Sequence, residues 1–125
     1  MAELIRSVYA GQVFKIEAYV TEGGECLAEA WLDRQSEAMQ KRFVALFMTL
    51  GDQGKIWNET KFKHLEGSDG IFEFKADGGR VLCFFFVGHR VVLTHGFKKQ
   101  GPKTPRGEIV RAEDLKKIFL QRSGK

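Results

Sequence analysis

The chain has 125 residues, of which 43% are apolar and 29% charged, and its formal net charge is +4 at pH 7. This composition is typical of one globular domain with one core, here residues 1–125, and excludes an intrinsically disordered chain. The longest apolar run, residues 81–87, is too short for a membrane span, and no basic head precedes an apolar stretch at the N-terminus. We therefore expect a cytoplasmic protein, in which Cys26 and Cys83 are reduced thiols of the core.

The first half of the chain predicts one strand followed by two helices. Polar and apolar side chains partly alternate over residues 12–20, which favours a strand that the stretch 21–25 ends. Residues 26–34 suit a short helix. A second helix should begin after Ser36, a favourable N-cap, and end at Gly51. Its apolar stripe at helical period consists of Met39, Phe43, Leu46, Phe47 and Leu50.

The second half predicts three strands and a last helix. Residues 56–70 favour a loop with at most one helical turn. Strands should follow at 71–76, 80–87 and 90–97, joined by a turn at 77–79 and by the two residues Gly88 and His89. The middle strand is apolar on both faces, which is typical of a central strand. The last helix should start with Thr104 as its cap and Pro105 at its first helical position.

This order, β-α-α-β-β-β-α, predicts an α+β domain built on a mostly antiparallel sheet. It comprises an N-terminal strand, a two-helix hairpin, a three-strand meander and a C-terminal helix. We expect the helices to share one face of the sheet and to leave the other face open for a partner.

The positive charge is concentrated in the second half. Residues 1–60 hold six Lys/Arg and nine Asp/Glu, whereas residues 61–125 hold fourteen and seven. Residues 78–107 contain six Lys/Arg, two histidines and no carboxylate. Such a field attracts polyanions, and nucleic acid would bind it with a steep salt dependence. A basic face kept for solubility, or for docking an acidic protein, is the alternative.

Cations are also the candidates for chemistry. His64, His89 and His95 do not lie at metal-ligand spacing from another histidine, a cysteine or a carboxylate, so we expect no metal and no cofactor. In an antiparallel meander the start of one strand lies beside the end of the next, which brings Arg80 near residues 95–99. The basic side chains before, within and after the predicted meander are Lys61, Lys63, His64, Lys75, Arg80, His95, Lys98, Lys99, Lys103 and Arg106.

A cluster of this kind suits phosphoryl chemistry on RNA. The 2′-hydroxyl of RNA is its own nucleophile, so the protein needs only to orient it, stabilise the charged phosphorane and protonate the leaving oxygen. Arginine holds phosphate oxygens bidentately, and a lysine beside other cations, or a histidine, can move the proton. The alternatives are structural: Arg80 can pair with Asp77 or Glu73, His95 can be a hydrogen-bonded core residue, and the lysines can be solvated.

The motifs of residues 61–112 resemble the phage-derived, HigB-like branch of the RelE/ParE toxin superfamily. The matching pieces are Lys63-His64-Leu65, Glu73-Phe74-Lys75, Arg80-Val81-Leu82, His95-Gly96-Phe97-Lys98-Lys99, Lys103-Thr104-Pro105 and Glu108-Ile109. The helical hairpin before them agrees in placement, so the resemblance covers most of the chain.

The resemblance implies a RelE-like fold and the toxin half of a type II toxin–antitoxin pair. Such toxins are mRNA interferases: metal-independent endoribonucleases that inhibit translation by cutting mRNA in the ribosomal A site, leaving a 2′,3′-cyclic phosphate and a 5′-hydroxyl. The implied partners are the ribosome, mRNA and an adjacently encoded antitoxin, expected to be a helix-turn-helix protein. By strand position, Arg80 and Lys98 or Lys99 match cations that stabilise the scissile phosphate. We expect catalytic roles for Arg80, His95, Lys98, Lys99 and Lys103, and RNA binding by Lys61, Lys63, His64, Lys75 and Arg106.

The chain departs from the family pattern in ways that keep other functions open. RelE-type enzymes often carry a tyrosine near the C-terminus, whereas this chain has only Tyr9 and Tyr19. His95 or Lys103 are then the candidates for the general base. At Lys75 the family more often has arginine. ParE relatives share the fold, poison DNA gyrase and cleave nothing, so the alternatives are a non-nucleolytic toxin and a silent RNA- or protein-binding module.

Overall fold

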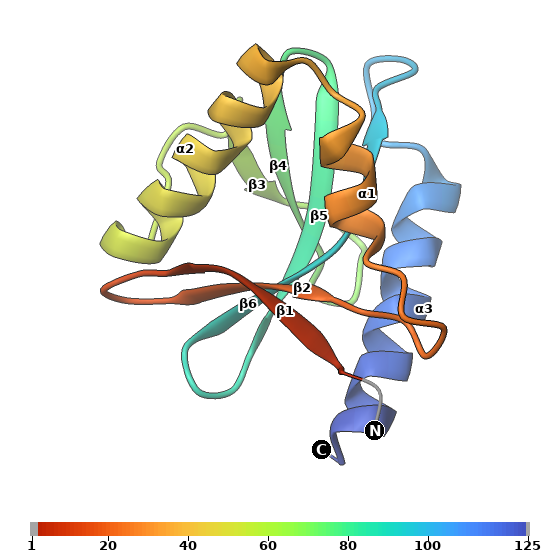
Figure 1. Ribbon diagram of the computed structural model, residues 1–125. Coiled ribbons are helices and arrows are strands. Elements are labelled where there is room, and N and C mark those ends of the chain that lie inside the picture. The colour runs from red at the N-terminus through yellow and green to blue at the C-terminus, as the bar shows by residue number, and fades with distance from the viewer. Residues whose placement is uncertain (1–2, 125) are drawn as a thin grey trace.

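The protein is described by a computed structural model for residues 3–124. These residues form six strands and three helices (Figure 1). In chain order the elements are β1 (Ile5–Ala10), β2 (Lys15–Tyr19), α1 (Leu27–Asp33), α2 (Glu37–Gln53), β3 (Phe62–His64), β4 (Phe72–Ala76), β5 (Gly79–Phe86), β6 (Arg90–Lys98) and α3 (Arg106–Ser123).

The strands form one mixed sheet in the order β1-β2-β6-β5-β4-β3. All neighbouring strands are antiparallel except β2 and β6, which run parallel. The predicted meander is confirmed as β4-β5-β6. Asp77 and Gly78 both have positive φ, 48° and 80°, and form a two-residue turn that pairs Ala76 with Gly79. The second turn holds residues 87–89, one residue more than predicted, because Phe86 pairs with Arg90.

Two strands differ from the sequence prediction. The expected single N-terminal strand is a hairpin, in which β1 pairs with β2 through an irregularity between Ser7 and Tyr9. The expected loop over 56–70 contains β3, which pairs three residues with β4. Both are edge strands with several exposed side chains. Their extended state follows from pairing with a neighbour, because neither has a strong apolar alternation of its own.

Helices α1 and α2 cover one face of the sheet. Trp31, Phe43 and Phe47 pack there on the side chains that β2, β4, β5 and β6 send to that face. Ser36 caps α2 as predicted, accepting a hydrogen bond from the Met39 backbone N–H at 3.1 Å. The predicted end of α2 at Gly51 was wrong, because the helix continues to Gln53 and Gly54 takes the left-handed C-cap conformation.

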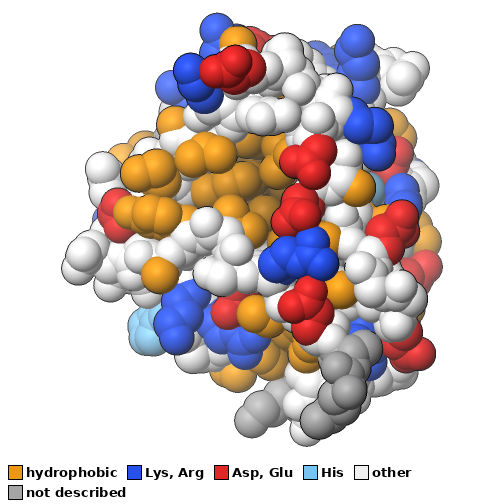
Figure 2. Space-filling view, viewed as in Figure 1, with side chains coloured by type: hydrophobic (Ala, Val, Ile, Leu, Met, Phe, Trp, Pro, Cys, Tyr) orange, Lys and Arg blue, Asp and Glu red, His pale blue; other side chains and the backbone are white. Residues whose placement is uncertain are grey.

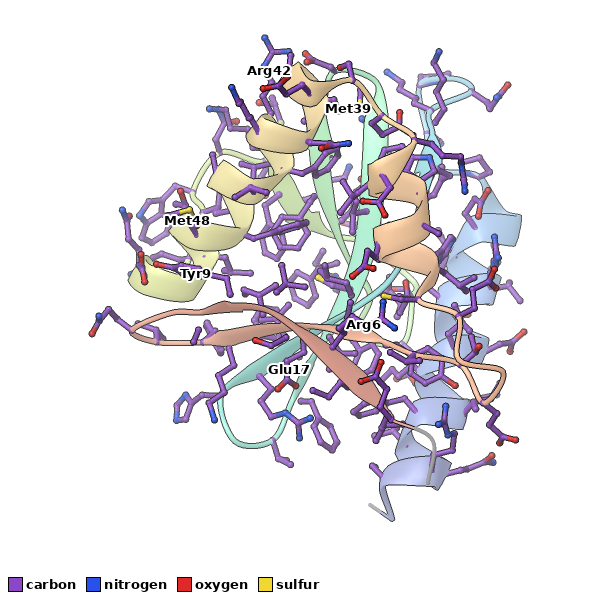
Figure 3. All side chains as sticks on the ribbon, in the orientation of Figure 1. Arg6, Tyr9, Glu17, Met39, Arg42 and Met48 are labelled. Carbon is purple, nitrogen blue, oxygen red and sulfur yellow. The ribbon has the colours of Figure 1, made fainter. Side chains whose placement is uncertain are left out.

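Gly51 is instead a crossing point between α2 and the N-terminal hairpin. A Cβ atom at Gly51 would lie 3.0 Å from the Tyr9 ring, and one at Gly11 would lie 2.2 Å from the carbonyl carbon of Gly51. The Tyr9 hydroxyl donates to Asp52 at 2.6 Å, so the hairpin is held directly against the end of α2 (Figure 3). The glycine that the sequence suggested as a helix stop therefore allows close packing inside the helix.

The opposite face of the sheet is not open, which corrects the expectation that all helices share one side. Ile109, Ala112 and Phe119 of α3 pack on it with Leu82 and Phe84 of β5. Strand β5 is thus apolar on both faces because both are covered, as its sequence predicted. Helix α3 covers only part of this face, and the uncovered part beside its N-terminus holds the candidate site. Within residues 3–124 no helix is both long and apolar enough to cross a membrane.

Candidate functional site

Strand pairing gathers basic side chains on the α3 face of β3, β4 and β5. Lys63 lies opposite Glu73 in the register, and Lys75 lies opposite Arg80. Their chain neighbours Phe62, Phe74 and Val81 point into the α1/α2 core. Because side chains alternate along a strand, the polar residues point to the other face. The alternation that builds the core therefore also places the cations together.

The segment 99–104 between β6 and α3 forms a second wall, so that these side chains line a pocket of about 410 Å³. We call it the cation pocket. The basic residues that line it are Lys63, His64, Lys75, Arg80, Lys99 and Lys103. Glu59, Glu66 and Glu73 line it as well, so the positive charge is not uniform.

Glu73 organises the floor of the cation pocket. Its side chain is only 1% exposed and accepts a short hydrogen bond from the Thr104 hydroxyl. Arg80 Nε lies 3.6 Å from one carboxylate oxygen, and Lys75 Nζ lies 4.0 Å from the other. Arg80 also donates to the Gly79 carbonyl at 2.8 Å. Glu73 and the Gly79 carbonyl therefore fix the position of the Arg80 guanidinium, as a preorganised anion-binding group requires.

Thr104 does not cap α3, which corrects a second detail of the sequence prediction. The N-cap is Pro105 and no side chain caps the helix. The Thr104 hydroxyl is engaged with Glu73, so it ties the loop of the second wall to β4. The motif Lys103-Thr104-Pro105 thus positions a wall of the pocket.

The pKa of Lys75 is lowered within this cluster. Burial lowers the pKa of the Lys75 ammonium, the positive charge of Lys63 lowers it further, and Glu73 opposes the change. A lysine with a lowered pKa can exchange a proton more readily near neutral pH than a solvated one. The lowered pKa makes Lys75 a candidate for proton transfer within the cation pocket.

A second opening of about 590 Å³ adjoins the cation pocket and shares Lys75 and Arg80 with it. Lys61 lines this opening. Arg42 from α2 forms an ion pair with Asp77 at its margin, joining the helix to the β4–β5 turn (Figure 3). Asp77 therefore pairs with Arg42, and Arg80 pairs with Glu73, which settles the two pairing alternatives left by the sequence.

The structure does not bring His95 to the cation pocket. Its side chain is 2% exposed, and Nε2 lies 2.9 Å from Oε1 of Glu108. The Thr94 hydroxyl donates to the Leu82 carbonyl at 3.2 Å and also lies 3.2 Å from Nδ1 of His95, so both ring nitrogens have a polar neighbour. Burial lowers the pKa of His95, although the Glu108 hydrogen bond opposes this. His95 thus fastens β6 to the first turn of α3, which agrees with the structural alternative.

We predict that His95 makes stability fall as the solution is acidified from about pH 6.5 to pH 5. In the unfolded chain His95 takes up a proton near its ordinary pKa of about 6.5, whereas burial delays this in the folded state. The folded state therefore loses stability as pH falls, by at most about 1.4 kcal/mol per pH unit. Urea unfolding of wild type and His95→Gln across this range measures the effect. The slope should flatten in His95→Gln and persist in His89→Gln, a variant of an exposed turn; equal slopes in all three would contradict the assignment.

Besides Lys61, which lines only the second opening, two further predicted site residues lie outside the cation pocket. Lys98 pairs with Gly79, and a Cβ atom at Gly79 would meet Trp31 of α1, so Lys98 belongs to the α1/α2 face. Arg106 is exposed at the first position of α3 and does not line the pocket. Sequence reasoning named Glu73 only as a pairing alternative and missed its link to Thr104. No local signal reports that link, because the two residues are 31 positions apart.

A separate apolar groove lies on the α1/α2 face, as Figure 2 shows. It has a volume of about 230 Å³ and lies between α1, α2 and β1. Val8, Val44 and Met48 are 40%, 48% and 42% exposed on this side of the molecule. Acidic side chains, including Glu29 and Asp33, border it. Its apolar floor and acidic border set it apart from the cation pocket.

A family match and a structural match relate this chain to known proteins. The family described as phage-derived protein Gp49-like matches residues 30–117. A comparison with curated proteins found no match. Among solved structures, a chain of the archaeal RelE–RelB complex from Pyrococcus horikoshii OT3 superposes with a TM-score of 0.54 at 13% identity, covering 74% of this chain and 100% of that one. The fold is therefore RelE-like, as the sequence resemblance implied.

Proposed function

We propose, from the premise that this chain belongs to the phage-derived Gp49-like family, that it is the toxin of a type II toxin–antitoxin pair and cleaves mRNA on the ribosome. The single observation that carries the proposal is the cation pocket, in which Arg80 is held by Glu73 and which Lys99 and Lys103 also line. The RelE-like fold supports the toxin class but not the chemistry, since one fold can serve several functions. The proposed targets, mRNA and the ribosome, are cytoplasmic, so we propose that the protein acts in the cytoplasm.

In the proposed reaction the 2′-oxygen of one nucleotide attacks the adjacent phosphorus and the P–O5′ bond breaks. The products are a 2′,3′-cyclic phosphate and a 5′-hydroxyl. Arg80 is positioned to hold the phosphate oxygens, and Lys99 and Lys103 add positive charge where the phosphorane becomes more negative. No metal is required in this scheme, because the cations supply the charge.

The two proton transfers need a group that accepts the 2′-hydroxyl proton and one that protonates the 5′-oxygen. His95 fits poorly, because it is buried and both ring nitrogens are engaged. Lys75 lines the pocket and has a lowered pKa, and Lys103 lies in the opposite wall. We assign the proton transfers to these two lysines, with Lys63, His64 and Lys61 binding the flanking backbone.

Mapping of mRNA 5′ ends after induction in bacteria tests the proposal. Wild type should arrest growth and produce cuts inside translated codons that bear 5′-hydroxyls. The double variant Arg80→Glu/Lys99→Glu should produce neither, because reversing two pocket charges repels the phosphate. Lys15→Glu/Arg34→Glu, which changes the net charge equally at exposed positions outside the pocket, is the matched control and should behave as wild type. Arrest with intact mRNA would replace the proposal by a gyrase-directed or other non-nucleolytic toxin.

A toxin of this class needs an antitoxin, and the chain offers two surfaces for one. An acidic segment could fill the cation pocket, or an apolar segment could occupy the groove between α1, α2 and β1 (Figure 2). Co-expression of the adjacent reading frame with the toxin should restore growth. Co-purification with Arg80→Glu/Lys99→Glu then separates the surfaces, since the complex should be lost only if the antitoxin occupies the cation pocket.

A further inference from the structure

Trp57 is the most exposed large apolar side chain among the described residues. It is 83% exposed, whereas Trp31, the other tryptophan, is 8% exposed in the core. Tyr19 is buried, and the Tyr9 hydroxyl is bonded to Asp52. Because an indole in water forgoes most of its favourable burial, an exposed tryptophan often marks a contact with a partner.

The surroundings of Trp57 indicate the chemistry of that partner. Trp57 lines a hollow of about 400 Å³ together with Phe62, Phe72 and Phe85. The ammonium of Lys55 lies 4.5 Å from the Trp57 ring centroid. We call this hollow the aromatic shelf. It combines aromatic walls with a cation, which is the combination that binds the bases and backbone of single-stranded nucleic acid.

The aromatic shelf lies on the α1/α2 face, to which Phe62, Phe72 and Phe85 belong, and meets the cation pocket at the edge strand β3. Glu59 and Lys63 line both, and Lys63 lies on the edge strand β3 between them. His64 lines the cation pocket and also packs against Phe72 of the shelf, with ring centroids 5.1 Å apart and the rings tilted by 60°. A chain whose phosphate occupies the cation pocket would therefore reach the aromatic shelf by passing round the edge of the sheet at Lys63.

We propose that Trp57, with Lys55, stacks on an unpaired base of the single-stranded RNA whose backbone occupies the cation pocket. The inference rests on the proposed function for the kind of ligand, and it adds the part of the site that holds the bases. Stacking of this kind accepts any base, because each has a π-face, so the aromatic shelf raises affinity without fixing the sequence. An amphipathic protein segment is the competing occupant, and the test below separates it.

Intrinsic fluorescence provides a direct test, because Trp57 is exposed and Trp31 is buried. Wild type is titrated at low salt with a short single-stranded RNA carrying 2′-deoxy nucleotides, which prevents cleavage. Fluorescence should be quenched on binding, and quenching should disappear when one particular position of the oligonucleotide is abasic. Trp57→Phe should keep most of the affinity without the signal. Trp57→Ala should weaken binding, measured by anisotropy of labelled RNA, by about five- to hundred-fold.

Val87→Ala, at an exposed position of the turn between β5 and β6, is the control and should bind RNA as wild type does. Unquenched fluorescence, or equal RNA affinity of Trp57→Ala and wild type, would overturn the inference. So would a Trp57→Ala variant that loses only its antitoxin, since the aromatic shelf would then be a protein interface. If mRNA is cleaved in cells but RNA does not quench Trp57, only the stacking proposal is overturned. If RNA quenches Trp57 but no mRNA is cleaved in cells, the nuclease proposal is overturned and the stacking proposal stands.

Discussion

Replacing Arg80 by methionine should lower the rate of mRNA cleavage by about 10²- to 10³-fold, which is the effect of removing one preorganised donor from a developing negative charge. Arg80 is suited to such a loss because its side chain is only 13% exposed and is held by Glu73 and by the Gly79 carbonyl. Lysine at this position keeps the charge but loses the planar fork and the bond to Gly79. Arg80→Lys should therefore recover only part of the rate.

Single-turnover cleavage of a programmed ribosome measures this prediction, with the enzyme in excess so that the chemical step is observed. Arg34→Met is the matched control, because Arg34 is an exposed arginine at the end of α1 and lies outside the cation pocket. Circular dichroism should show that both variants are folded. A cleavage rate in Arg80→Met within threefold of wild type would show that Arg80 does not stabilise the reacting phosphate. The lysines of the pocket would then be the remaining candidates for that role.

The elements that sequence predicted well are those with a strong pattern of their own. The apolar stripe of α2 and the apolar middle strand β5 needed no tertiary information, and the Asp77-Gly78 turn has the residues that positive φ favours. Strands β1 and β3 could not be predicted in this way. They are short, partly exposed and extended because a neighbouring strand supplies hydrogen bonds.

The site was predictable to the extent that it follows strand alternation. Arg80 and Lys75 share a face because they are register partners. The sequence predicted the meander and placed Arg80 near residues 95–99, but its three-residue turn did not give this pairing. Lys98 and Lys99 show the limit of the method, since a shift of one residue sends a strand side chain to the other face. Only Lys99 reaches the cation pocket. His95 shows the same limit, because its partner Glu108 lies on a helix whose position over the sheet is tertiary information.

The sequence offered Glu73 as a partner for Arg80 but gave no sign of its link to Thr104, and this residue yields the largest expected effect on stability. Glu73→Leu leaves Arg80 and Lys75 without their counter-charge and the Thr104 hydroxyl without its acceptor. Removal of one partner from a buried ion pair typically costs about 3–5 kcal/mol. We expect a loss of this size in urea unfolding. Glu73→Gln should lose less, because the amide oxygen can still accept from Thr104.

Glu73→Gln also separates a structural ion pair from an anion site. In wild type the carboxylate competes with any bound anion for Arg80, so its neutralisation should make the cation pocket bind sulfate more tightly. Sulfate stabilises a folded state in proportion to its affinity for that state, and the gain in unfolding free energy should be larger in Glu73→Gln than in wild type. Glu17→Gln is the matched control, since Glu17 is likewise buried and pairs with Arg90 at 2.6 Å on the same sheet. Equal sulfate gains in the two variants would mean that the pocket does not select anions, and Glu73 would then be a structural residue only.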